Sequence, residues 1–115
     1  MMGRKVLNDN AHNAFLAADK GDARIIIPAI VLMEVMYLFE KHRVPISLLQ
    51  IEDLMQSENY RCEPLGLEIL QVAVEIDDIP ELHDRLIAAT ARALDLPLIT
   101  NDPELHNSRF ISVVR

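Results

Sequence analysis

The apolar residues recur with two different spacings, and the switches between them predict alternating helices and strands. Residues 6–19 follow helical spacing and predict an amphipathic helix, with Gly21 suited to the left-handed position that ends it. The continuous β-branched run at 24–27 predicts a strand buried on both faces. Residues 29–42 are apolar nearly all round and predict a buried helix, which Pro28 opens at no cost in hydrogen bonds.

Another helix is expected from residue 48 to about 57. Ser47 stands at its N-cap, and Gln50 follows three residues later in the capping-box position. A short extended piece is predicted at 60–63, and a helix at 65–76. The apolar residues expected to point inward from that last helix are Leu65, Leu67, Leu70 and Val74.

The final forty residues have the clearest pattern. An alanine-rich helix is predicted from Pro80 to Leu94, slim enough for close packing on a sheet. A short apolar strand at 98–100 follows, broken by an Asn-Asp-Pro turn, and 110–114 predicts a last strand. At 115 residues, without a linker or an internal repeat, the chain is expected to form one α/β domain spanning 1–115.

Composition narrows the class of function. The formal net charge of −7 argues against a non-specific polyanion binder but not against a nuclease, because a metal ion bound to an acid cluster reverses the local sign. The single cysteine, Cys62, fits a reducing compartment, and it has no His–Asn/Asp arrangement that would make it a nucleophile. No apolar run reaches the ~18 residues of a membrane helix. We therefore expect a cytoplasmic protein that does not enter a membrane.

Glu34 is the most informative single residue, because its one-turn neighbours on the predicted helix are apolar. Burying an unpaired carboxylate costs several kcal/mol, so a compensating group is expected. Three explanations are open at this point. They are a structural ion pair, for example with Arg85, a set of hydrogen-bond donors, and a metal ion.

Two aspartates favour the metal. Asp84 lies in the first turn of its predicted helix and Asp102 just past the end of a predicted strand. Each is ordinary when taken alone, since acids suit helix starts and turns. In a parallel α/β sheet, however, helix starts and strand ends share one edge, and Glu34 in the second turn after a strand lies near that edge too. Three converging carboxylates suit Mg²⁺ or Mn²⁺ and phosphodiester hydrolysis by a metal-bound water.

Other polar residues are assigned weaker roles. Thr100 and Asn101 are candidates for holding a water or the phosphate, and a structural role for Thr100 is equally open. The residues Lys41, His42, Arg43 and Arg85 are candidates for contact with a nucleic-acid backbone, against the simpler interpretation as helix-end charges and ion pairs. The four histidines show no zinc spacing and are interpreted as structural or surface residues: His12, His42, His83 and His106.

Three segments resemble the PIN domain family, in particular toxins of VapC type. They are Pro28–Val35, His83–Ala91 and Leu96–Asp102, in the order and spacing of the family, and the resemblance covers nearly the whole chain. It implies a three-layer α/β/α fold with a short parallel sheet and a Mg²⁺- or Mn²⁺-dependent endoribonuclease, in which Glu34, Asp84 and Asp102 match metal-site acids. It also implies a homodimer, an RNA substrate and a cognate antitoxin protein.

The sequence departs from the family at its start. The family opens with a strand of the form apolar-apolar-Asp-Thr, whose Asp belongs to the metal site, whereas this chain starts at what looks like the following helix. Asp9 is the nearest substitute, although its surroundings fit a helix better. We therefore expect a PIN-like fold that lacks its first strand, with impaired or absent cleavage. The alternative function is a non-catalytic module that binds a second copy or an antitoxin.

Overall fold

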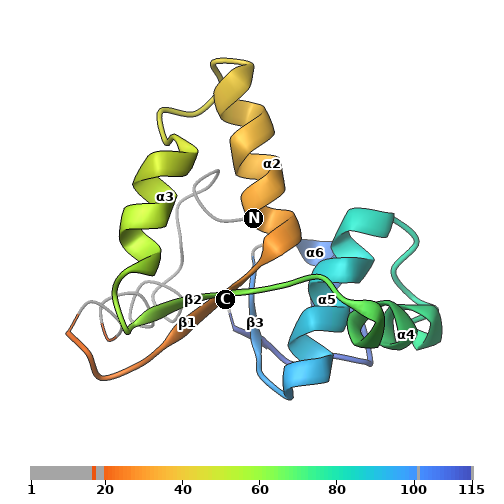
Figure 1. The fold of residues 1–115 in the computed structure, drawn as a ribbon. Helices are drawn as coiled ribbons and strands as arrows, with labels where there is room; N and C mark the ends of the chain where they lie inside the picture. Colours follow the sequence, from red (N-terminus) through yellow and green to blue (C-terminus); the bar gives the residue numbers. More distant parts are fainter. Residues whose placement is uncertain (1–16, 18–19, 101, 115) are drawn as a thin grey trace. The chain divides into compact units, whose positions relative to one another are not determined.

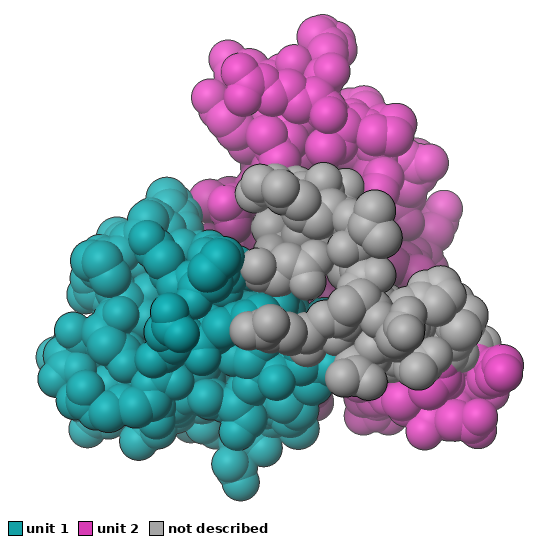
Figure 2. Space-filling model, turned by 180° about the vertical axis from the view of Figure 1, so that it is seen from behind, with its two compact units in different colours: residues 1–13, 65–115 teal, residues 14–64 magenta. Residues whose placement is uncertain are grey.

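The computed structural model describes residues 17, 20–100 and 102–114. The helix predicted at 6–19 and the candidate Asp9 therefore lie outside the described residues, apart from Ala17. The chain divides into two compact units, and their described parts are residues 17 and 20–64 in unit 2 and residues 65–114 without 101 in unit 1 (Figure 2). Each unit is an α/β arrangement built on a short parallel pair of strands.

Unit 2 begins with strand β1 (Ile25–Pro28), which pairs in parallel with β2 (Tyr60–Glu63) along its whole length. Gly21 before it has φ of +82°, which confirms the expected left-handed position. Both strands match their predicted ranges within one residue. Burial is lower than predicted, since only Ile27 of β1 is fully buried, and β2 is the only described strand that pairs with β1.

Helix α2 (Ala29–Glu40) follows β1 directly, as Figure 1 shows, and ends two residues earlier than predicted. The prediction that α2 is buried all round is wrong. It contacts α3 and β1, and the buried residues Ile30, Val31 and Val35 form one stripe. Several apolar residues outside that stripe are exposed, among them Tyr37 by 54%.

Helix α3 (Leu48–Met55) starts as its sequence predicts. The Gln50 amide donates to Ser47 Oγ over 3.2 Å, and the Ser47 amide donates to Gln50 Oε1 over 2.8 Å. This reciprocal capping box satisfies two of the backbone donors that a helix start leaves without partners. The capping box thereby fixes the connection from α2 to α3 at the point where it enters α3.

Unit 1 contains α4 (Leu67–Glu75), α5 (Leu82–Leu94), β3 (Leu98–Ile99), α6 (Pro103–His106) and β4 (Val113–Val114). Strands β3 and β4 pair in parallel. Helices α4 and α5 pack on each other, and the small side chains of Ala88 and Ala89 on α5 are completely buried. The slim helix expected after Pro80 is therefore confirmed.

The inward face predicted for α4 is wrong. All four residues expected inside are exposed, Val74 by 83% and Leu67 by 70%. The buried positions are instead Ile69, Ala73 and, just after the helix, Ile76. Both stripes of α4 are apolar, and the stripe that includes the small Ala73 allows a close approach to another helix. An apolar surface is consequently left on the outside of α4.

The helices of the described residues include none that is long and apolar enough to cross a membrane.

Candidate functional site

Glu34 lies in the second turn of α2, in unit 2. Its Oε1 atom is shielded from solvent and accepts no hydrogen bond from a described residue. An unsatisfied buried carboxylate oxygen is expensive and needs an explanation, such as a cation bound beside it. The compensating group that the sequence predicts for Glu34 is therefore not seen as a hydrogen bond to Oε1 from any described residue.

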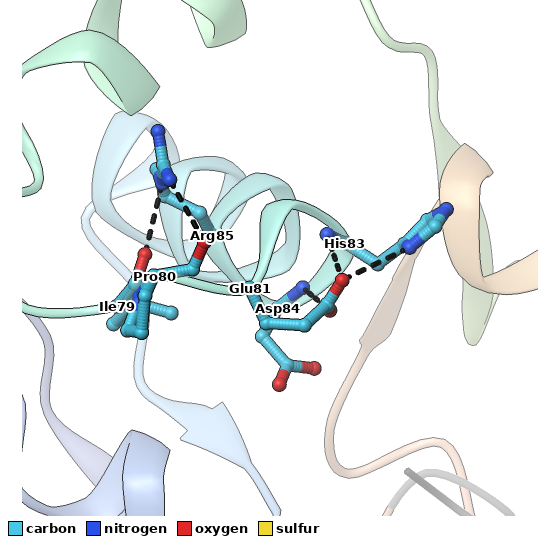
Figure 3. Close-up of polar contacts among 6 residues, drawn as sticks. All are labelled: Ile79, Pro80, Glu81, His83, Asp84 and Arg85. Carbon is cyan, nitrogen blue, oxygen red and sulfur yellow. Dashed lines mark hydrogen bonds and ion pairs between the residues drawn. The ribbon is translucent and has the colours of Figure 1, made fainter.

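The alternative partner, Arg85, is engaged within unit 1. Its Nε donates to the carbonyl oxygen of Ile79 over 2.9 Å, and its Nη2 donates to that of Pro80 over 3.0 Å. Figure 3 shows the guanidinium folded back over the turn that precedes α5. No ion pair between Arg85 and a described carboxylate is present, so in the described structure this arginine orders the entry to α5.

Asp84 occupies the first turn of α5 as predicted, and the residue before the helix organises that turn. Glu81 accepts from the amides of Asp84 over 2.9 Å and His83 over 3.1 Å. In Figure 3 the Glu81 carboxylate turns onto this first turn, while that of Asp84 points away from it. The hydrogen bonds from the Asp84 and His83 amides hold the pKa of Glu81 below its ordinary value. The capping role of Glu81 was missed in the sequence, because glutamate is not among the residues that usually cap a helix N-terminus.

Asp102 follows β3 and caps α6. Its Oδ1 accepts from the Glu104 amide over 3.0 Å, and its own amide donates to Thr100 Oγ1 over 3.1 Å. Its Oδ2 takes no hydrogen bond from another described residue. Among the described residues, the carboxylate is thus held in place through one oxygen.

Thr100 is buried, with 5% of its surface exposed. Its hydroxyl oxygen accepts from the Asp102 amide, and its carbonyl oxygen contacts His106, so both groups stabilise the turn around Asp102. His106 Nε2 lies 2.7 Å from the Thr100 carbonyl oxygen, consistent with the structural role expected of this histidine. Asn101 is outside the described residues. The geometry therefore assigns Thr100 to positioning Asp102.

The two aspartates belong to the same end of unit 1. Helix α5 and strand β3 run in opposite directions, so the start of α5 and the end of β3 lie at one end (Figure 1). Glu34 belongs to unit 2 and is described there by itself. Among the described residues no group of three His, Cys, Asp or Glu side chains is close enough to hold a metal ion. The three-acid metal site remains a prediction.

Two hollows are lined by other residues than these acids. One of about 390 Å³ in unit 2 is lined by Phe39, His42, Arg43, Val44 and Pro45. Another of about 720 Å³ in unit 1 lies where the C-terminal end of α5 meets the segment before β4. In it the guanidinium groups of Arg92 and Arg109 lie 5.2 and 4.6 Å from the ring centroid of Phe110.

Comparison with known proteins identifies the family. A model of the PIN domain matches residues 5–111, and the chain therefore belongs to the PIN domain family. As a class, PIN domains are generally divalent-metal-dependent nucleases. The resemblance seen in the sequence is confirmed.

A solved structure supports the same fold. The chain is similar to one in the crystal structure of VapBC2 from Rickettsia felis bound to a DNA fragment from their promoter. The TM-score is 0.67 at 21% sequence identity, covering 93% of this chain and 85% of that one. Among curated proteins there is no significant match. The predicted α/β PIN-like fold is thus confirmed.

Proposed function

We propose that this chain is a VapC-type toxin, a Mg²⁺- or Mn²⁺-dependent endoribonuclease that a cognate antitoxin inhibits. The observation that carries the proposal is the shielded Oε1 of Glu34, which has no partner among the described residues. A carboxylate with that environment is well matched to a divalent cation, whose charge offsets the cost of burial. Family membership supports the same class of chemistry.

Glu34, Asp84 and Asp102 would hold the ion through carboxylate oxygens. Bound there, a divalent ion supplies a water acidic enough to attack a phosphodiester and a positive charge for the developing oxyanion. The protein's own contribution is orientation. Thr100 fixes the backbone at Asp102, Glu81 fixes the turn that carries Asp84, and α2 presents Glu34. Among the proposed substrate contacts, Asn101 follows Thr100 directly, and Arg85 lies one residue after Asp84.

Mn²⁺ is a more sensitive probe of such a site than Mg²⁺, because Mn²⁺ binds a given ligand set more tightly.

The second candidate function is a non-catalytic interaction module. It is favoured by the apolar surface on α4, where Leu67 and Val74 are largely exposed. Such a surface is typical of an interface and suits a homodimer or an antitoxin contact. Both candidates include these partners, and they differ in whether metal binds and RNA is cut.

The test compares the wild-type chain with Asp102→Asn in RNA cleavage and in calorimetry with Mn²⁺. Asparagine caps a helix as well as aspartate does, so this substitution removes the charge and keeps the α6 cap. Asp95→Asn, a change at an exposed aspartate after α5, is the matched control. We expect Mn²⁺ binding and RNA cleavage by the wild type and the control, and loss of both in Asp102→Asn. Cleavage unchanged by Asp102→Asn refutes the site, and absent Mn²⁺ binding favours the interaction module.

A further inference from the structure

The C-terminal end of α2 has a fixed backbone geometry. The His42 amide donates to the Phe39 carbonyl and the Arg43 amide to the Leu38 carbonyl, each over 2.9 Å. His42 is in the left-handed conformation, with φ of 58°. Together with the two hydrogen bonds, that conformation forms a Schellman motif. Lys41, His42 and Arg43, called the basic loop below, are therefore held in one conformation although they are exposed.

The residue in the left-handed position is unusual. Glycine normally occupies it because a β-carbon there is strained. A histidine costs stability at this point and places an imidazole ring in the wall of the 390 Å³ hollow. Non-glycine residues in this conformation cluster at functional sites, although histidine adopts it more readily than most residues.

The basic loop also carries charge that the described protein does not neutralise. The guanidinium groups of Arg61, Arg85, Arg92 and Arg109 each bind a described residue. Of the described arginines, Arg24 and Arg43 alone make no side-chain hydrogen bond, ion pair or ring contact with another described residue. Lys41 makes no ion pair with a described residue, and its Nζ lies 5.5 Å from the centroid of the Tyr37 ring. In a chain of net charge −7, this loop is a local positive feature.

An exposed aromatic ring completes the surface. Phe39 is 40% exposed and lines the same hollow as His42 and Arg43. The helix dipole by itself explains positive charges at the end of a helix. It does not explain an exposed aromatic ring or a hollow beside those charges. Cations beside exposed aromatic rings are the combination that binds single-stranded nucleic acid, through phosphates and stacked bases.

We propose that the basic loop and Phe39 bind single-stranded RNA, with Arg43 and Lys41 on phosphates and a base against Phe39 and His42. This inference rests on the proposed function, because it takes the RNA substrate from there. Lys41 lies seven residues after Glu34 along the same helical path. At a rise of about 1.5 Å per residue, that separation is about 10 Å along the helix axis. One RNA strand can therefore contact the loop while a neighbouring phosphodiester lies at Glu34. The loop positions the substrate and takes no part in the bond cleavage.

The test measures binding in EDTA, where no cleavage occurs, so that it is separate from the nuclease proposal. A fluorescein-labelled RNA of roughly 12 nucleotides, within the site size of single-strand binders, is titrated with the full chain. The variants are Arg43→Ala, Lys41→Ala and Phe39→Leu, and Arg24→Ala is the matched control because Arg24 also has no partner among the described residues. Thermal melting of each variant confirms that it folds.

Each phosphate contact contributes about 0.7 to the slope of log affinity against log salt for single strands. Raising the salt from about 50 to about 200 mM should therefore lower the ratio of wild-type to variant affinity about threefold. This holds for Arg43→Ala and for Lys41→Ala. Phe39→Leu should weaken binding at both salt concentrations without changing the slope. The control Arg24→Ala should change neither quantity.

Three outcomes of the titration in EDTA overturn the inference. One is that the wild-type chain binds no RNA in EDTA, another that Arg24→Ala has the same effect as Arg43→Ala. The third is that polyglutamate of equal charge displaces the RNA as well as unlabelled RNA does, which identifies an acidic protein segment as the ligand. Cleavage that depends on Asp102 but not on Arg43 leaves the nuclease proposal standing and refutes this one. RNA binding by the wild-type chain without RNA cleavage leaves this inference standing and refutes the nuclease proposal.

Discussion

Ser108 donates its hydroxyl hydrogen to Asp78 Oδ1 over 2.9 Å, which joins two segments separated by thirty residues. The Arg109 amide donates to the other oxygen of Asp78, also over 2.9 Å. The turn before α5 is thereby tied to the segment that follows α6. Helix α5 carries Asp84, and Asp102 caps α6. The Asp78 carboxylate therefore holds together the segments that adjoin these two helices.

Replacing Asp78 should therefore destabilise unit 1. Asp78→Ala removes a charged acceptor of two hydrogen bonds, and such bonds contribute about 1.5–3 kcal/mol each before the remaining groups regain water. We expect a loss of about 2 kcal/mol in urea unfolding. Asp77→Ala is the control, because its ion pair with Arg109 is 66% exposed on both sides. That pair should contribute less than about 1 kcal/mol. Equal losses in the two variants would contradict the assignment.

Acid should weaken the same region. Although partial burial raises it, hydrogen bonds from Arg109 and Ser108 bring the pKa of Asp78 below its ordinary value of 3.8, and the pKa of Glu81 is held below 4.5. A carboxyl whose pKa is lower in the folded state stabilises that state above its unfolded value and stops doing so as pH falls through the folded value. We expect the urea midpoint to fall below about pH 4.5. The double variant Asp78→Asn, Glu81→Gln should lack the part of this fall that protonation of the two carboxylates causes.

Local signals in the sequence predicted the elements well. The capping box at Ser47, the left-handed Gly21 and the start of α5 after Pro80 each depend on a few neighbouring residues, and each was confirmed. The resemblance to PIN domains was carried by short segments of the same kind. Glu34 was singled out in the same way from its apolar neighbours one turn away, and its Oε1 is shielded without a hydrogen bond from a described residue.

The buried side of each helix was harder to predict, because it depends on the element that the helix packs against. Helix α4 has two apolar stripes, and hydrophobicity favoured the one with Leu70 and Val74. The partner of α4 is α5, whose surface of completely buried alanines accepts a close neighbour, so the stripe with Ala73 is inside. The Asp78 contact to Ser108 was likewise missed, because nothing local relates residues thirty positions apart.

The left-handed residues make a prediction about stability. His42 has φ of 58° and Asp95 has φ of 55°. His42→Gly should stabilise the protein by about 1 kcal/mol, because it relieves the strain of a β-carbon in this conformation. Asp95→Gly is the matched comparison and should gain a similar amount, since aspartate and histidine both adopt this region more readily than most residues.

Denaturant unfolding measures both variants. A destabilised His42→Gly would show that the imidazole makes a stabilising contact. The same variant should bind RNA more weakly, so that stability and binding change in opposite directions.

The shielded oxygen of Glu34 makes the sharpest prediction. Without metal, Glu34→Gln should raise the free energy of unfolding by roughly 1 kcal/mol, because it removes a shielded charge while nearly preserving shape. Mn²⁺ at about 100 times its dissociation constant should stabilise the wild type by about 2.7 kcal/mol. It should leave Glu34→Gln unchanged.

Glu40→Gln, at an exposed position on the same helix, is the control and should respond to Mn²⁺ as the wild type does. Thermal melting with and without Mn²⁺ gives all of these values. If Glu34→Gln destabilises the metal-free protein, the carboxylate has a partner and a structural role. If the variant responds to Mn²⁺ as fully as the wild type, the ion binds without Glu34. Both results together would remove Glu34 from the proposed metal site.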